Sequence, residues 1–312
     1  MTRSTSVVVL GAGMVGTCTA LQLAQRGHAV TLVDRREPGR ETSYGNAGLI
    51  QREAVEPYAF PRQPGTLARI ALKRGVDVNY HFSALAGLAR PLARYWANSQ
   101  PQRHAVISQA YTRLIEHSTL EHAPLIEQAG AADLVQRDGY LWVFRQAASL
   151  RQATEKAQAL AQSYGLQHTA LDSDELAAAE PALRIRLAGA IHWHDTWAVS
   201  DPGALVARYA DLFVQAGGQL ARGDAGSLSP TATGWQVRTD TGTSERIVVV
   251  STSSPRASRY SRKPPATAAS TTSLTVQPRA CLTRLISARG RVPKATVRLA
   301  VMGALNFSLG AS

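Results

Sequence analysis

Three glycines near the N-terminus, Gly11, Gly13 and Gly16, have the spacing GxGxxG, and the acid Asp34 follows. Glycine suits a tight turn after a strand, a close approach of the backbone to a phosphate, and close packing of a helix on a sheet. A helix that begins at such a turn directs unpaired amides and a positive dipole end at the phosphate. An acid at this distance accepts hydrogen bonds from a ribose. The pattern predicts a site for a dinucleotide.

The residues around the glycines predict the elements that this site needs. Residues 7–10 form a short apolar run, as expected of a parallel strand that is buried on both faces. Apolar residues at helical spacing follow, Gly27 ends the predicted helix, and a second strand ends at Asp34. The turn residues that we expect against the cofactor are Gly11, Ala12, Gly13, Met14, Val15 and Gly16.

The glycines do not distinguish NAD from FAD, because both dinucleotides enter this fold in the same way. Asp34 argues against a 2′-phosphate, since two negative groups would face each other. Arg35 and Arg36 weaken that argument if they reach the phosphate, but they are equally consistent with solvated charges at a strand end.

A second segment, ETSYGNAGLI at residues 41–50, bears on the choice of dinucleotide. Its hydroxyl and amide groups can hydrogen-bond a diphosphate or a ring edge, and its small residues leave room for flat contact. Alone it is a polar turn. Together with the glycine turn it resembles the FAD-dependent D-amino-acid dehydrogenases of the D-amino-acid oxidase superfamily. In that family a Ser-x-x-Asn-Ala-Gly segment follows the ribose acid and extends towards the flavin.

The resemblance implies FAD as the cofactor. The contacts that it adds to the glycine turn are Asp34, Arg35, Ser43, Asn46, Ala47, Gly48 and Leu49. It also implies a reaction in which a D-amino acid gives a hydride to the flavin, and the resulting imino acid hydrolyses to a 2-oxo acid and ammonia. The expected partners are a small D-amino acid and a respiratory electron acceptor at the membrane surface. The family binds the substrate carboxylate chiefly through its C-terminal half, which the matched segments do not reach, so no catalytic residue is named.

The predicted fold is of the α/β class, with a Rossmann-type FAD-binding domain, an inserted α+β substrate domain and a basic, disordered C-terminal tail. A strand at 137–144 belongs to the insertion. Asp201 and Pro202 begin a helix, and a strand at 247–250 returns to the first domain. The expected boundaries are 1–80 for the first part of the FAD domain, 81–200 for the insertion, 201–250 for the return and 251–312 for the tail.

Composition changes abruptly at Ser251. None of the 22 acidic residues but ten of the 34 basic residues follow that point, so the first 250 residues carry +2 and the tail +10. A natural basic arm, a solvated extension and a change of reading frame near codon 250 would each give this pattern. The frame change is favoured, because the family pattern stops at Val250 and the tail lacks the interleaved aromatic residues or repeated basic motif of a dedicated binder. Nucleic acid is not an expected partner, since the tail lacks interleaved aromatic residues. With this tail we expect weak FAD retention and little turnover.

Two cysteines, Cys18 and Cys281, predict neither a disulfide framework nor a metal site. His192 and His194 would share one face of a strand, and without a third ligand they are interpreted as ordinary histidines. No metal is therefore expected.

The expected location is the cytoplasm, with attachment to the inner face of the plasma membrane as an alternative. Residues 85–96 are interpreted either as a core helix interrupted by Pro91 or as a segment lying on an acidic membrane. Two other functions stay open, an NAD-dependent dehydrogenase and a non-enzymatic nucleotide-binding fragment.

Overall fold

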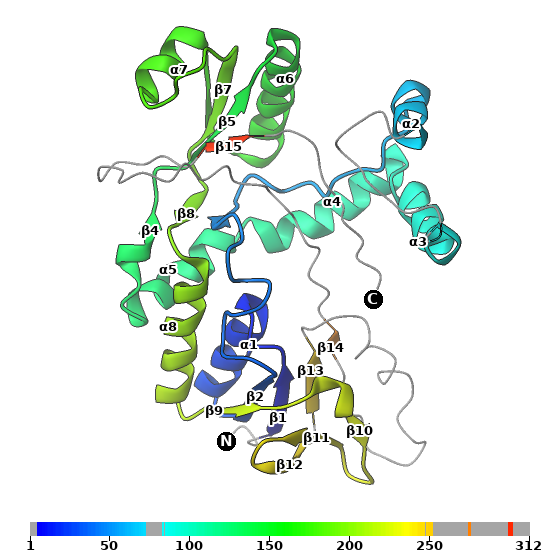
Figure 1. Cartoon of the computed structure of the whole chain (residues 1–312), viewed down its shortest axis with the longest axis vertical. Coiled ribbons are helices and arrows are strands. Elements are labelled where there is room, and N and C mark those ends of the chain that lie inside the picture. Colours follow the sequence, from blue (N-terminus) through cyan, green and yellow to red (C-terminus); the bar gives the residue numbers. More distant parts are fainter. Residues whose placement is uncertain are drawn as a thin grey trace. The chain divides into compact units, whose positions relative to one another are not determined.

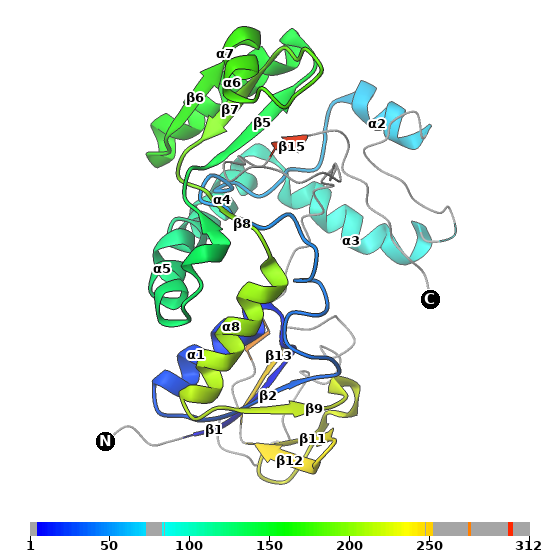
Figure 2. The same cartoon turned by 60° about the vertical axis from the view of Figure 1, so that its left-hand side comes forward.

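The computed structural model describes residues 5–72, 83, 85–246, 248–251, 274–275 and 299–301. They form two compact units, shown in Figures 1 and 2. Unit 1 comprises the described residues up to Gly48, residues 123–134 and the described residues from Val199 to Thr275. Unit 2 comprises the described residues of 49–122, residues 135–198 and residues 299–301. Each unit therefore draws on several separate stretches of the chain.

A parallel sheet in the order β14-β13-β1-β2-β9 forms the centre of unit 1. Its strands are β1 (Ser6–Leu10), β2 (Ala29–Asp34), β9 (Gln219–Arg222), β13 (Val248–Ser251) and β14 (Leu274–Thr275). Val8 of β1 pairs with Thr31 on one side and with Val249 on the other, and it is fully buried. The structure confirms the predicted strand at 7–10. It also confirms the strand predicted at 247–250, which is observed as β13.

Two helices of unit 1, α1 (Met14–Gln25) and α8 (Pro202–Gln215), pack against each other beside this sheet (Figure 2). Asp201 caps α8 by accepting a hydrogen bond from the amide of Ala204 at 2.9 Å, and Pro202 is its first residue, as predicted. Tyr209 and Phe213 of α8 are fully buried. The predicted apolar face of this helix is therefore part of the core.

A small antiparallel sheet in unit 1 consists of β10 (Ser229–Pro230), β11 (Trp235–Thr239) and β12 (Gly242–Arg246), and the short 3-10 helix η3 (Ala225–Ser227) precedes it. Trp235 and Val237 alternate with polar residues and pack against a cluster that includes Val8, Leu10 and Val33. The predicted alternation of apolar and polar residues in β11 thus places Trp235 and Val237 in a core shared with the parallel sheet.

Unit 2 contains a sheet in the order β15-β5-β7-β6, with α6 (Ala147–Tyr164) and α7 (Ser173–Ala179) packed against it. The strands are β5 (Tyr140–Phe144), β6 (His168–Leu171), β7 (Gly189–Trp193) and β15 (Leu299–Val301). A smaller sheet is formed by β3 (Leu49–Ile50), β8 (Trp197–Val199) and β4 (Val135–Gln136), which follows η2 (Ala132–Leu134). β5 confirms the strand that was predicted within 137–144.

Four further helices are α2 (Pro64–Ala71), α3 (Leu85–Asn98), α4 (Pro101–Ile115) and α5 (Ser118–Gln128). The expectation that residues 85–96 form a core helix interrupted by Pro91 is wrong. α3 continues through Pro91, and none of its residues is buried. Pro91 is exposed, so water can hydrate the carbonyl of Gly87 that loses its amide partner.

Most of the basic tail lies outside the described residues, and so does Ile247. The described part of the tail consists of Ser251 and the strands β14 and β15. Among the described residues, no helix is both long enough and apolar enough to cross a membrane.

Gly139→Ala should strongly destabilise unit 2. Gly139 has a φ of 78°, and a Cβ at this position would collide with the carbonyl of Trp193. We expect a loss of at least about 3 kcal/mol in the free energy of unfolding, measured by urea denaturation.

Gly165→Ala is the matched control, because Gly165 has a φ of 66° but no atom within 4 Å of an added Cβ. It should cost only about 1 kcal/mol. Equal losses in the two variants would contradict the role given to the contact with Trp193.

Candidate cofactor site

The turn between β1 and α1 has the geometry that the glycine spacing predicts. Gly11 adopts a φ of 102°, and its amide donates to the carbonyl of Val33 at 2.8 Å. A residue with a side chain would be strained there. A Cβ on Gly13 would lie 3.3 Å from Oγ of Ser43, tighter than an ordinary contact. The turn therefore leaves its backbone open to a ligand and excludes side chains from it.

The first amides of α1 can bind an anion. The amide of Met14 donates to Oγ of Ser43 at 3.0 Å, and the amide of Thr17 donates to the carbonyl of Gly13 at 2.9 Å. Between them, the amides of Val15 and Gly16 have no acceptor among the described residues. Unpaired amides at a helix N-terminus, together with the helix dipole, favour a phosphate.

Asp34 is held at the end of β2 by two backbone amides. Its Oδ2 accepts from the amide of Ala12 at 2.7 Å, and its Oδ1 accepts from the amide of Arg36 at 3.1 Å. A carboxylate has about four acceptor positions, so two are left for the hydroxyls of a ribose. Asp34 is thus fixed in position beside the turn that would hold the diphosphate.

The segment at 39–48 folds back onto the same turn. The amide of Gly39 donates to the carbonyl of Ala12 at 2.9 Å, and Ser43 is buried. The amide oxygen of Asn46 accepts from the amide of Gly48 at 2.8 Å, so this side chain forms a local turn. The structure brings Ser43 to the helix terminus.

Ala47 lies inside the local turn that Asn46 closes, between Asn46 and Gly48. The carbonyl of Gly48 accepts from the amide of Val199 at 2.6 Å, and Leu49 begins β3. The turn at 46–48 is thereby anchored to the last residue of β8.

Arg35 and Arg36 both contact Glu41. The Nε atoms of the two arginines lie 2.8 Å and 3.0 Å from Oε1 of Glu41, and both guanidinium groups are largely exposed. The hydrogen bond from Arg35, with its positive charge, lowers the pKa of Glu41. No sequence pattern indicated Glu41 as the partner of these two arginines.

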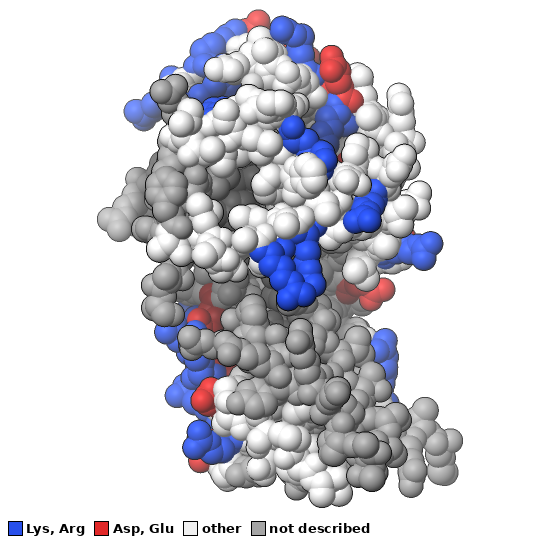
Figure 3. Space-filling model, turned by 90° about the vertical axis from the view of Figure 1, so that its right-hand side faces the viewer, with Lys and Arg blue, Asp and Glu red and all other residues white. Residues whose placement is uncertain are grey.

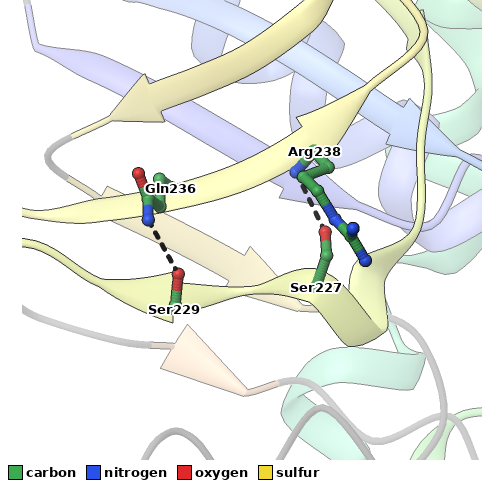
Figure 4. A pocket seen from close by; sticks show the side chains of 4 residues that line it. All are labelled: Ser227, Ser229, Gln236 and Arg238. Carbon is green, nitrogen blue, oxygen red and sulfur yellow. Dashed lines mark hydrogen bonds between the residues drawn. The ribbon is translucent and has the colours of Figure 1, made fainter.

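A shallow pocket of about 300 Å³ lies on the small antiparallel sheet, and Figure 4 shows its four lining residues. Nε2 of Gln236 donates to Oγ of Ser229 at 3.1 Å, and the amide of Arg238 donates to Oγ of Ser227 at 2.9 Å. None of the residues predicted to bind the cofactor lines this pocket.

The two histidines of β7 and the following turn, His192 and His194, contact each other and the backbone. The rings of His192 and His194 lie 4.2 Å apart, and Nε2 of His192 donates to the carbonyl of Asp138 at 2.7 Å. In the part of the chain that the structure describes, no three potential metal ligands come together.

In unit 2, the buried carboxylate of Glu53 accepts from the hydroxyl of Tyr140 at 2.9 Å and from Thr196. The sequence did not single out Glu53, because its donors are distant in the chain.

The fold and the turn together define a dinucleotide-binding protein of the α/β class. Residues 6–299 match the family model described as FAD dependent oxidoreductase, and the chain belongs to this family. The match extends past Val250, where the family pattern was expected to stop. The dinucleotide of this family is FAD, which decides between the two cofactors that the glycines left open.

Two curated relatives are named as enzymes of D-amino acid oxidation. A D-amino-acid oxidase from Bradyrhizobium diazoefficiens is 30% identical over 234 residues, which cover 73% of this chain and 54% of that protein. A D-amino acid dehydrogenase from Chromohalobacter salexigens is 33% identical over 193 residues, or 61% of this chain and 46% of that protein. The chain thus spans about half the length of these relatives.

Solved structures show the same fold. Glycine oxidase from Geobacillus kaustophilus matches with a TM-score of 0.54 and 20% identity, covering 83% of this chain and 58% of that one. L-proline dehydrogenase from P. horikoshii has a TM-score of 0.54 and 16% identity, covering 83% and 55%. At these identities the likeness supports the fold.

Asp34→Ala should weaken FAD binding about tenfold or more, because hydrogen bonds to a charged acceptor contribute about 1.5–3 kcal/mol. The measurement is a titration followed by quenching of flavin fluorescence. Asp211→Ala, which changes an exposed acid of α8, is the control and should bind as the parent does. A folded Asp34→Ala variant with unchanged affinity would show that this carboxylate does not contact the ribose.

Cys18 is half-buried and should react much more slowly in the folded chain than in the unfolded chain, since desolvation raises the pKa of its thiol to about 12. In a Cys281→Ser variant, iodoacetamide should alkylate Cys18 quickly only after unfolding. Above pH 9, the ordinary thiol pKa, the unfolded chain loses a proton that the folded chain retains. The free energy of unfolding should therefore fall as the pH rises towards 12. Equal alkylation rates before and after unfolding would refute the burial argument.

Proposed function

We propose that unit 1 binds the ADP part of FAD and that the chain acts as a flavin-dependent oxidoreductase on D-amino acids. The observation that supports it most directly is the pair of open amides on α1, Val15 and Gly16, beside the fixed carboxylate of Asp34. One group suits a diphosphate and the other suits a ribose. An anion site beside a fixed acceptor suits the two polar parts of a dinucleotide.

Each proposed contact has a separate task. The open amides of Val15 and Gly16 would hold the diphosphate, with Gly11 and Ala12 forming the turn and Gly13 and Met14 beginning the helix. The amide of Met14 occupies one acceptor position on Ser43, so its hydroxyl proton is available to a phosphate oxygen. The small residues Ala47 and Gly48 leave room for the cofactor to extend towards Leu49, and Asn46 fixes their conformation. Arg35 remains a proposed contact through its backbone, because its guanidinium is engaged by Glu41.

The substrate class follows from the relatives, among which a D-amino-acid oxidase and D-amino acid dehydrogenases recur. When bound, the flavin supplies the chemistry of hydride removal from the α-carbon. The chain's own residues orient the cofactor for that step. We further propose residues 81–200 as the insertion that contributes to the substrate site. The proposed electron acceptor is a respiratory component at the membrane surface, which the protein would reach from the cytoplasm by peripheral attachment.

The visible spectrum of the purified chain tests this proposal. We expect a flavin spectrum after incubation with FAD, and anaerobic bleaching by D-alanine but not by L-alanine. Weak retention of FAD and slow bleaching are expected, and both are measured against a full-length D-amino acid dehydrogenase as the reference. A colourless protein that fails to bind FAD, or a flavin that L-alanine reduces equally well, would contradict the proposal.

A further inference from the structure

The inner face of helix α4 is polar, whereas several of its aliphatic residues lie on the outside. Ser108 and Thr112 are buried, and His104 on the same face is half-buried. The hydroxyl of Thr112 donates to the carbonyl of Val55 at 3.0 Å, and Nε2 of His104 donates to the carbonyl of Pro57 at 2.7 Å. These bonds satisfy the inner face, so α4 is held in place largely by polar contacts, with Ile115 packed against a core cluster of unit 2.

Val106, Ile107 and Leu114 lie on the opposite face of α4, and they are 67%, 37% and 73% exposed. Their spacing places them together over two helical turns, with Ala110 exposed between them. An amphipathic helix of a water-soluble protein normally has the reverse arrangement. A gathered set of exposed aliphatic residues, unlike a single one, indicates a surface that binds a partner.

The charged side chains of α4 are positive, and the half-exposed acid Glu116 follows the helix. Arg103 and Arg113 of α4 are exposed, α4 contains no acid, and no ion pair joins either arginine to another described residue. Residues 57–115 contain eight basic residues and one acid. Figure 3 shows several groups of basic side chains and only small acidic patches on the upper part of the surface that it draws. The partner of this face should therefore be anionic.

We propose that the outer face of α4 lies on an anionic lipid surface. Its aliphatic side chains would enter the boundary between headgroups and acyl chains, and Arg103 and Arg113 would contact lipid phosphates. The inference rests on the proposed function, because the membrane on which α4 would lie is where that function places the respiratory electron acceptor.

A second copy of this chain is a poorer occupant of the same face. Two α4 helices packed face to face would bring together arginines without any acid on either helix. The basic tail is excluded as an occupant by the same repulsion. A lipid surface needs no matching groove, and it supplies both the negative charge and the apolar environment.

Binding of the full chain to sedimented vesicles tests the proposal without flavin or substrate. The vesicles contain either phosphatidylglycerol and phosphatidylcholine in equal parts or phosphatidylcholine alone. Val106→Ser combined with Leu114→Ser should weaken binding to the anionic vesicles about tenfold or more, because burial of each side chain is lost. Arg103→Gln combined with Arg113→Gln should weaken it about thirtyfold, since each charge contributes about 1 kcal/mol near such a surface.

Ile185→Ser is the control, because Ile185 is an exposed aliphatic residue outside α4 and its replacement should change binding by less than about twofold. Circular dichroism would establish that all variants are folded. Unchanged binding of the Val106/Leu114 variant would overturn the proposal and assign the binding to the tail. Absence of binding, equal binding to uncharged vesicles, or a dimer in solution that this variant dissociates would also overturn it. Since no flavin is involved, failure here leaves the proposed oxidoreductase function to its own test.

Discussion

The hydrogen bond between the amide of Ala12 and the carboxylate of Asp34 joins the two parts of the candidate site. Ala12 lies in the turn after β1, and Asp34 lies at the end of β2, so the bond fixes the ends of two adjacent parallel strands. This bond holds Asp34, the proposed acceptor for the ribose, beside the turn that leads into α1. The segment at 39–48 depends on the same turn, since Gly39 bonds to the carbonyl of Ala12. One local constraint therefore orders every element that the proposed cofactor would touch.

Much of unit 1 could be predicted from the sequence because its signals are local. Glycine spacing predicted the turn, Asp201 and Pro202 predicted the start of α8, and alternation predicted β11. Each of these depends on residues within one element or at its ends. The family resemblance added the expectation of FAD, and the match with the family model supports it.

Features of unit 2 were harder to predict because they depend on distant partners. The hydrogen bond from Thr112 to Val55 joins residues that are far apart in sequence, and so does the bond from Tyr140 to Glu53. Hydrophobic periodicity alone assigns the aliphatic face of α4 to the core. It cannot show that backbone carbonyls of a distant segment accept hydrogen bonds from the polar face. The error at Pro91 has a related cause, because the rule that proline interrupts a helix does not include hydration of an exposed carbonyl.

The position of β1 in its sheet has a consequence for how the chain folds. β1 pairs with β2 on one side but with β13 on the other, and Val8 meets Val249 across that second pairing. During synthesis the first strand emerges early, whereas its neighbour is made only after almost all of unit 2. One edge of β1 therefore stays open until then, and closing the sheet carries the entropy loss of a very long loop. Folding of this nucleotide-binding unit should be slow, and the nascent chain should depend on chaperones that cover the unpaired strand edge.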